Sequence, residues 1–285
     1  MKSPASSLHT FLRLTTVGET APAAPVSVNP VFRVVKYVLF DILQNRIVIG
    51  YTVFLLAVSM GLFGLSDDPT KGLISLLNIV LIVTPLVSSV FATIHFYNSY
   101  EFIELLAAQP VRRDIIVWSQ FLGLVLALLA AVWIGIGIPI AIYSATSTGL
   151  VLLVAASGLT VVFIALALLA SVCTRDKAKG IGLALLLWFY FTLLYDAMVL
   201  FIMFSFADYP LEKATLVMAA LNPIDLARVI VLLQMDISAL MGYTGALFRE
   251  WLGSSAGIAT AVGILLLWAT LPMLLAVRIF RKKDL

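Results

Sequence analysis

Six long hydrophobic stretches, separated by shorter polar segments, dominate the sequence. Each stretch is about 19 to 29 residues long. Because an α-helix rises about 1.5 Å per residue, a stretch of this length crosses a hydrocarbon layer of about 30 Å. A helix also satisfies its own backbone polar groups in lipid. The pattern therefore predicts transmembrane helices near residues 47–65, 73–96, 115–143, 150–172, 180–206 and 257–280.

The composition agrees with this pattern. Of the 285 residues, 62% are hydrophobic and 12% are charged, and the mean hydropathy is +1.10. A soluble domain of this size carries far more polar surface, so the class is an all-α integral membrane protein. The net charge of +3 is typical of loops that face anionic lipid headgroups, and a nucleic-acid partner is not needed to explain it.

The remaining segments have distinct patterns. Residues 1–30 are rich in Ser, Thr, Ala and Pro without periodicity, which predicts a disordered extension before a transmembrane domain at 31–285. If residues 31–46 are drawn as a helix, polar side chains lie on one face and apolar side chains on the other. This pattern predicts an amphipathic helix in the plane of the membrane surface. The alternative is a polar lead-in to the first span. Residues 207–256 are too weakly hydrophobic to cross and form an external segment.

The distribution of Lys and Arg predicts the orientation. Twelve of these residues lie in the lead-in, the second-to-third loop, the fourth-to-fifth loop and the C-terminal end, and four lie in the opposite loops. Basic residues accumulate on the cytosolic side of membrane proteins. The count places both termini in the cytosol.

The stretch from Tyr100 to Arg113 is the longest polar interruption on the predicted cytosolic side. Glu101 and Glu104 lie one helical turn apart, and we expect Asn98 to cap their helix. This pattern is suited to a coupling helix that fits a cytosolic partner, and the alternative is an ordinary amphipathic linker. The residues expected to contact the partner are Glu101, Phe102, Glu104, Leu105, Arg112 and Arg113.

Asp196 is the one acid inside a predicted span. Its position about 25 Å from the cytosolic end places it in the outer half of the membrane. A carboxylate there is expected to face protein or water, because exposure to lipid is costly. Asp196 and Tyr195 are candidates for a transport pathway or a dimer interface. The alternative is a packing role in which Asp196 is hydrogen-bonded to Tyr195 or Tyr190.

The external segment contains a clear helix start. Asn222 is a suitable N-cap, Pro223 fits the first helical position, and Asp225 can pair with Arg228 three residues later. These four residues are candidates for docking an external partner. A structural cover over the outer mouth of the bundle is an equal alternative.

The remaining chemistry is mostly excluded. One cysteine, Cys173, and two histidines, His9 and His95, do not supply a conventional metal site. We expect His95 to cap a helix or to reach the headgroup region. The methionines are spaced as core fillers rather than as a copper path. The Walker A motif is absent, as are the motifs of membrane hydrolases, so we expect no enzyme and no bound cofactor.

Several motifs together resemble ABC-2-type permeases. They are the Glu101-x-x-Glu104-Leu-Leu helix, the Gln109-Pro-Val-x-Arg113 connection and Gln120-Phe-Leu-Gly123 at the start of the third span. The resemblance covers residues 31 to 285. It implies a homodimer of six-span subunits whose segment between spans two and three is a coupling helix. It also implies a separate cytosolic ATPase subunit that binds ATP and magnesium.

A narrower resemblance lies in the second half of the chain. Lys177-Ala-Lys-Gly180, Tyr195-Asp196 and Leu221-Asn-Pro-x-Asp225-x-x-Arg228 look like the NosY branch, the permeases that support copper-centre assembly of nitrous oxide reductase. This implies a bacterial cytoplasmic membrane and a periplasmic copper-handling β-helix partner. The cargo stays open between a sulfur species, copper and purely mechanical work. The alternatives are an ABC-2 exporter of a lipid, polysaccharide or drug, and, less favoured, a membrane-embedded enzyme.

Overall fold

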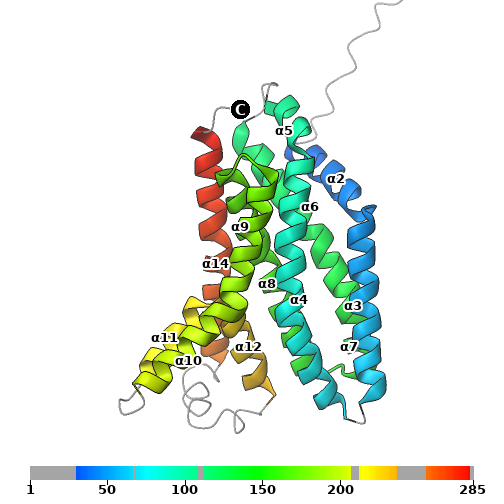
Figure 1. The fold of residues 1–285 in the computed structure, drawn as a ribbon. Coiled ribbons are helices and arrows are strands. Elements are labelled where there is room, and N and C mark those ends of the chain that lie inside the picture. The colour runs from blue at the N-terminus through cyan, green and yellow to red at the C-terminus, as the bar shows by residue number, and fades with distance from the viewer. Residues whose placement is uncertain (1–29, 67, 108–111, 207–211, 236–254, 283–285) are drawn as a thin grey trace, which may run out of the picture. The chain divides into compact units, whose positions relative to one another are not determined.

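The structure is a computed structural model, which describes residues 30–66, 68–107, 112–206, 212–235 and 255–282. These residues form a bundle of helices (Figure 1). The predicted disorder of residues 1–30 therefore lies almost entirely outside the described residues. The helices are α2 (Pro30–Leu43), α3 (Arg46–Leu65), α4 (Pro69–Asn98), α5 (Tyr100–Ala107), α6 (Arg113–Val132), η1 (Trp133–Gly137), α7 (Ile138–Tyr143), α8 (Ser147–Cys173), α9 (Lys177–Phe189), η2 (Tyr190–Leu194), α10 (Tyr195–Ser205), α11 (Glu212–Leu221), α12 (Pro223–Gln234) and α14 (Ser255–Lys282).

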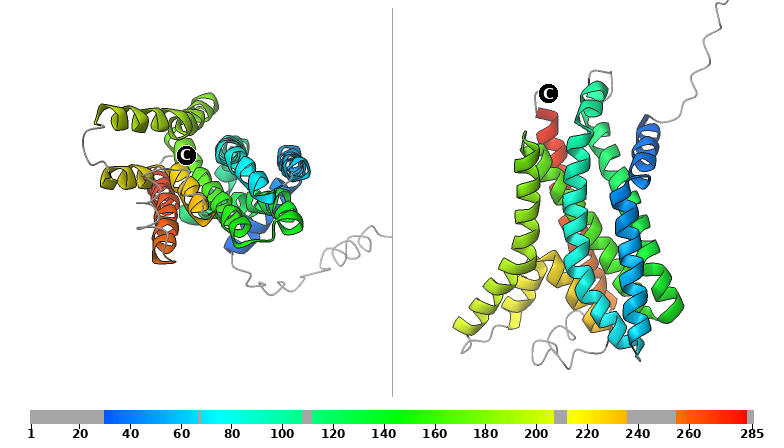
Figure 2. Two further views of the ribbon diagram at one scale, coloured as in Figure 1. Left: turned by 90° about the horizontal axis from the view of Figure 1, so that it is seen from below. Right: turned by 45° about the vertical axis from the view of Figure 1, so that its right-hand side comes forward.

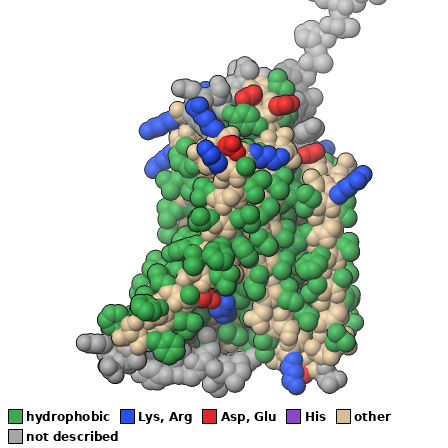
Figure 3. Space-filling view, viewed as in Figure 1, with side chains coloured by type: hydrophobic (Ala, Val, Ile, Leu, Met, Phe, Trp, Pro, Cys, Tyr) green, Lys and Arg blue, Asp and Glu red, His purple; other side chains and the backbone are tan. Residues whose placement is uncertain are grey.

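Six segments in these described ranges are long and apolar enough to cross a membrane. The prediction of an all-α membrane protein with six spans is confirmed. In Figure 3, hydrophobic side chains cover the middle of the visible surface, and charged side chains gather mainly toward its upper end. The spans are Arg46–Leu65, Pro69–Asn98, Arg113–Tyr143, Ser147–Cys173, Lys177–Ser205 and Ala259–Lys282.

Polar residues between the spans start the helices. Asn45 accepts a hydrogen bond from the backbone N–H of Ile47 at 2.9 Å, and Asp68 accepts one from Thr70 at 2.9 Å. Such caps satisfy amide groups that have no partner within the helix. The polar breaks in the sequence therefore fix the helix boundaries as well as the loops.

The fourth span, α8, lies in the middle of the bundle and contacts α4, α6, α9, α12 and α14 (Figures 1 and 2). Most of its side chains are buried, among them Leu159 and Phe163, which are both fully inaccessible. The fifth span differs, because few of its residues are covered by other helices. Its second half, α10, leans away from the bundle below η2 (Figure 2).

The third span has a close helix contact and an irregular turn at its glycines. Residues 133–137 form the π-helical turn η1. A Cβ atom on Gly135 would lie 2.6 Å from the Cβ of Leu55, so only glycine allows this approach to α3. Ser59 Oγ donates a hydrogen bond to the Gly135 carbonyl at 2.7 Å, which ties the two helices at that turn.

The residues predicted to face the cytosol gather at one end of the bundle. α2, α5, the start of α6 and the end of α14 lie there, and we call this the α5 end (Figure 1). We call the opposite end, which carries α12 and the turn before α8, the α12 end. There, Gln234 Nε2 of α12 donates to Ser147 Oγ of α8 at 3.3 Å. The direction of the two ends across the membrane stays a prediction.

Candidate functional site

The acidic helix α5 has a buried side and an exposed side. Ile103 is fully buried, and the half-buried Phe102 packs against the same core. Glu101, Glu104 and Leu105 are exposed, and 66% of Leu105 is accessible. The helix is therefore anchored by two apolar side chains and presents two carboxylates and one leucine outward.

The expected cap on this helix is wrong. Asn98 is the last residue of α4, and its side-chain oxygen accepts a hydrogen bond from Lys177 Nζ at 2.8 Å. The break falls instead at Ser99, whose N–H donates to the carbonyl of His95 at 2.9 Å. A single residue thus separates α4 from α5. The side-chain oxygen of Asn98, which was expected to cap α5, accepts a hydrogen bond from Lys177 instead.

The two arginines after α5 lie at the start of the third span. Arg112 donates to Asp114 at 3.2 Å, and Arg113 Nη1 donates to the carbonyl of Arg281 at 3.5 Å. The guanidinium of Arg281 also donates two hydrogen bonds to Asp114. These contacts tie the start of α6 to the end of α14. The predicted break at Gln109 and Pro110 lies outside the described residues.

At the α12 end, three charged side chains from two helices form a cluster. Arg228 Nη1 lies 3.2 Å from Asp225 Oδ1, within α12, and 3.4 Å from Asp196 Oδ2, in the fifth span. The side chains are 37% exposed for Arg228, 32% for Asp196 and 17% for Asp225. The expected i, i+3 pair is confirmed, and it has a third member from a distant part of the sequence.

Asn222 holds the cluster in place. Its side-chain oxygen accepts from the N–H of Ile224 at 3.0 Å, so the predicted N-cap is confirmed, with Pro223 at the start of the helix. Its amide nitrogen donates to the carbonyl of Phe191 at 2.9 Å and to Asp225 Oδ2 at 3.0 Å. Both Asn222 and Pro223 are buried. Of the four residues expected to dock a partner, Asp225 and Arg228 are therefore the ones with accessible side chains.

The alternative prediction that Asp196 is hydrogen-bonded to Tyr195 or Tyr190 is wrong. Tyr195 Oη donates to the carbonyl of Met218 in α11 at 2.7 Å, and Asp196 pairs with Arg228. The tyrosine and the acid are adjacent in sequence but bind different helices of the external segment. Together they attach the fifth span to both α11 and α12.

The carboxyl of Asp225 has an unusual affinity for protons. Its pKa is raised from 3.8 to about 6; burial is the main cause, and the neighbouring Asp196 carboxylate is the second. Arg228 and the amide of Asn222 lower the pKa but only partly oppose this rise. Two acids and one base therefore share a site in which one acid titrates close to neutral pH.

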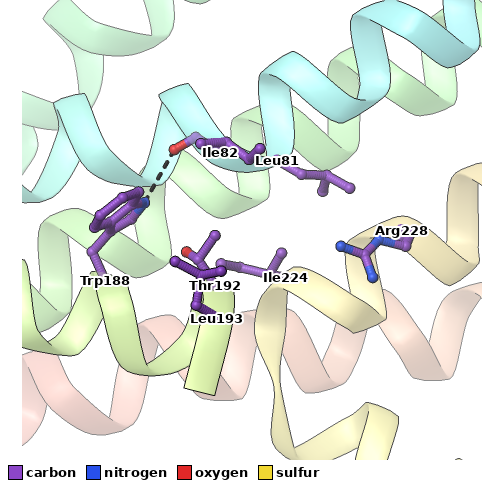
Figure 4. A pocket seen from close by; sticks show the side chains of 7 residues that line it. All are labelled: Leu81, Ile82, Trp188, Thr192, Leu193, Ile224 and Arg228. Atoms are coloured by element: carbon purple, nitrogen blue, oxygen red, sulfur yellow. Dashed lines mark hydrogen bonds between the residues drawn. The ribbon is translucent and has the colours of Figure 1, made fainter. Parts of the chain in front are cut away.

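A cavity of about 160 Å³ lies beside the cluster, between α4, the fifth span and α12 (Figure 4). Arg228 lies at one side of the cavity and Trp188 at the other, where its indole N–H donates to the Ile82 carbonyl at 3.1 Å. Thr192 Oγ1 is buried without a hydrogen-bonding partner among the described residues. No sequence pattern predicts this cavity, because its lining comes from three separate segments. The lining residues are Leu81, Ile82, Trp188, Thr192, Leu193, Ile224 and Arg228.

Resident metal chemistry has no support within the described ranges, where no group of three His, Cys, Asp or Glu side chains is placed to hold an ion. The ring of His95 is buried, stacks on Phe91 with ring centres 6.1 Å apart, and lies with Nε2 3.5 Å from Ser99 Oγ at the end of α4. Cys173 is exposed at the α5 end.

Comparison with known proteins gives one result. The sequence profile of a family described as ABC-2 family transporter protein matches residues 101–285, well over half of the chain. The match begins at the first acid of α5 and extends beyond the last described helix. No curated protein matched the chain.

Proposed function

This chain belongs to the ABC-2 family of transporter proteins as a multi-pass permease subunit, and we propose that it transmits force from a cytosolic ATPase to its α12 end. The family implies an ABC ATPase partner and a membrane location, and its permeases are not themselves catalytic. In this proposal ATP and magnesium bind to the partner subunit. The membrane is the cytoplasmic membrane of a bacterium.

The observation that carries the proposal is the division of α5 into an anchored side and an outward side. Ile103 is fully buried, while Glu101, Glu104 and Leu105 are exposed. A short helix held this way moves with the bundle when a partner pushes on its exposed side. Carboxylates also provide charge complementarity, which sets the orientation of a docked partner.

Force on α5 has two direct routes into the bundle. A single residue, Ser99, separates α5 from α4, so a tilt of α5 acts on the second span. The start of α6 is joined to the end of α14 through Asp114 and Arg281. A displacement at α5 therefore engages the second, third and sixth spans.

The fifth and sixth spans reach the external segment at the other end. Trp268 in α14 donates its indole N–H to the carbonyl of Ala220 in α11 at 3.1 Å. The fifth span is attached to α12 through Asp196 and Arg228. Relative movement of the fifth and sixth spans would therefore tilt the α11–α12 segment, which we propose to be the external docking platform.

We further propose that the work supports copper-centre assembly of nitrous oxide reductase, with a periplasmic copper-handling β-helix protein on the platform. The support is the Leu221-Asn-Pro-x-Asp225-x-x-Arg228 element, which resembles that branch of permeases. In this structure the element forms a capped helix with accessible charges at Asp225 and Arg228. The little-covered fifth span supports a second copy of the chain as a partner in the membrane.

Charge reversal tests the coupling role. The double variant Glu101→Lys/Glu104→Lys, reconstituted with its ATPase, should insert normally and lose stimulated ATP hydrolysis. A suitable control is Lys71→Glu, because it reverses an exposed charge at the α12 end without touching α5. Unchanged hydrolysis in the double variant would remove the coupling role from α5.

Deletion of the gene in the native host tests the copper role. The copper content of nitrous oxide reductase in the deletion strain should fall, and the plasmid-borne chain should restore it. An unchanged copper content would contradict this role and favour export of a lipid, polysaccharide or drug.

A further inference from the structure

A second cavity, of about 170 Å³, lies at the α5 end between α2, the end of α4, α5 and α6. It differs from the cavity beside Arg228 because five of its seven lining residues have polar side chains. The lining includes Asp41, His95, Asn98, Ser99, Phe102 and Gln120.

Gln120 contributes a buried side-chain amide to this cavity. The residue is 1% exposed, and neither its amide oxygen nor its amide nitrogen has a hydrogen-bonding partner among the described residues. Buried side-chain amides are normally hydrogen-bonded. Gln120 and His95 both line the cavity, and the His95 ring lies close enough to the amide to interact with it electrostatically. A group that enters there would therefore meet the acceptor and the donor of the Gln120 amide beside an imidazole.

The charges around the cavity have a defined order. Asp41 is the one charged side chain among the lining residues. Lys177 stands next to the lining, because its ammonium donates to the side-chain oxygen of Asn98 at 2.8 Å. An acid thus lines the cavity, and a base lies just outside it on the lining residue Asn98. This pattern complements a ligand that carries both a cation and an anion.

Exposed apolar side chains on the same helices favour a lipid, rather than a soluble molecule, as the ligand of this cavity. α2 is the predicted interfacial helix, and Phe40 beside Asp41 is 54% exposed. At the start of the first span, Ile47 is 51% exposed. Apolar side chains so close to a polar cavity provide a surface for acyl chains at the depth where lipid headgroups end.

We propose that this cavity binds the headgroup of phosphatidylethanolamine from the leaflet at the α5 end. The lipid ammonium donates to Asp41 and to the amide oxygen of Gln120, and the phosphate faces Lys177. The acyl chains lie along the exposed apolar side chains of α2 and α3. Because its lining includes α2 and α5, a bound lipid would hold the interfacial helix against the coupling helix.

The hydrogen bonds make the site selective. The primary ammonium of phosphatidylethanolamine has three donors, whereas the trimethylated ammonium of phosphatidylcholine has none. A charge-assisted hydrogen bond contributes enough to change a binding constant about tenfold or more. The site should therefore distinguish two lipids that carry the same net charge.

Native mass spectrometry of the full chain in detergent, titrated with each lipid, tests the proposal. The wild-type chain should retain phosphatidylethanolamine about tenfold more tightly than phosphatidylcholine. Asp41→Asn and Gln120→Leu should each lose most of this preference. Asp176→Asn is the matched control, since it removes a charge at the same end while asparagine still caps α9, and it should keep the preference.

Three results would overturn the proposal. The first is equal retention of the two lipids by the wild-type chain, and the second is an unchanged preference in Asp41→Asn, a variant that leaves the apolar core intact. The third uses phosphoethanolamine, the same headgroup without acyl chains. Displacement of the lipid by micromolar phosphoethanolamine would assign the cavity to a soluble ligand instead.

Discussion

The guanidinium of Arg228 in α12 lies 3.4 Å from the carboxylate of Asp196 in the fifth span. This pair gives the one acid in the apolar interior of a span a positive partner, which explains how a carboxylate is accommodated at this depth. The external helix α12 and the fifth span are therefore joined by an ion pair. Any movement that separates them must expose or leave unpaired an ionised group.

Removal of the shared cation should weaken this attachment. Arg228→Ala leaves the carboxylates of Asp196 and Asp225 together without a positive partner. We therefore expect the free energy of unfolding to decrease by about 1–3 kcal/mol. Unfolding of the chain in nanodiscs would measure this loss. The double variant Arg228→Ala/Asp196→Asn should recover part of it, because one of the two repelling charges is gone. Additive losses in the double variant would show that the two side chains do not interact.

The cluster should also make stability depend on pH. The pKa of Asp225 is raised from 3.8 to about 6 by burial and by Asp196, so the folded chain binds a proton more readily than the unfolded chain. The stabilising effect is complete below about pH 4 and is lost as pH rises through about 6. The unfolding temperature should therefore fall between about pH 4 and pH 6, and the free energy of unfolding should decrease by at most about 3 kcal/mol over this range.

Asp225→Asn checks the origin of this dependence. The variant should be nearly insensitive to pH in the same window, because the amide does not titrate. The exposed cap variant Asp176→Asn should behave like the wild type. If Asp225→Asn retained the full dependence, another group would be responsible.

The two sides of α5 should separate stability from coupling. Ile103 is fully buried, so Ile103→Ala should cost about 2–4 kcal/mol of stability through the lost contacts and the cavity left behind. Leu105 is 66% exposed, so Leu105→Ala should unfold like the wild type and reduce only the ATPase stimulation. Equal effects of the two variants on unfolding would contradict the division of α5 described above.

The glycine of the Gln120-Phe-Leu-Gly123 motif should be required by packing. A Cβ atom on Gly123 would lie 2.4 Å from Val38 Cγ1 of α2, so Gly123→Ala should displace the interfacial helix at a cost of about 1–3 kcal/mol. Val38→Ala in the same chain should restore part of the stability. Gly50→Ala is the control, because a Cβ atom there meets nothing within 4 Å and alanine favours the helix.

The features that the sequence predicted correctly depend on local physics. Six spans follow from length and hydropathy, because a helix in lipid satisfies its own hydrogen bonds. The start of α12 follows from Asn222 and Pro223, and the pairing of Asp225 with Arg228 follows from helical spacing. The outward acids of α5 follow from the same spacing.

The errors arise where a side chain has a distant partner. Asn98 does not cap α5, because its side-chain oxygen is hydrogen-bonded to Lys177, which lies 79 residues away in the sequence. Asp196 pairs with Arg228, 32 residues away, while Tyr195 donates to the carbonyl of Met218. No local pattern predicts such contacts.

The sequence by itself thus determined the class of the protein, its spans and its charged outward helix, since each depends on the order of apolar and polar residues over a few turns. Only the tertiary structure decided that two separately predicted sites are one cluster around Arg228. It also decided that Gln120 faces a polar cavity under α5. Both results depend on which helix faces pack together, and packing is set by the shapes of side chains that are far apart in the sequence.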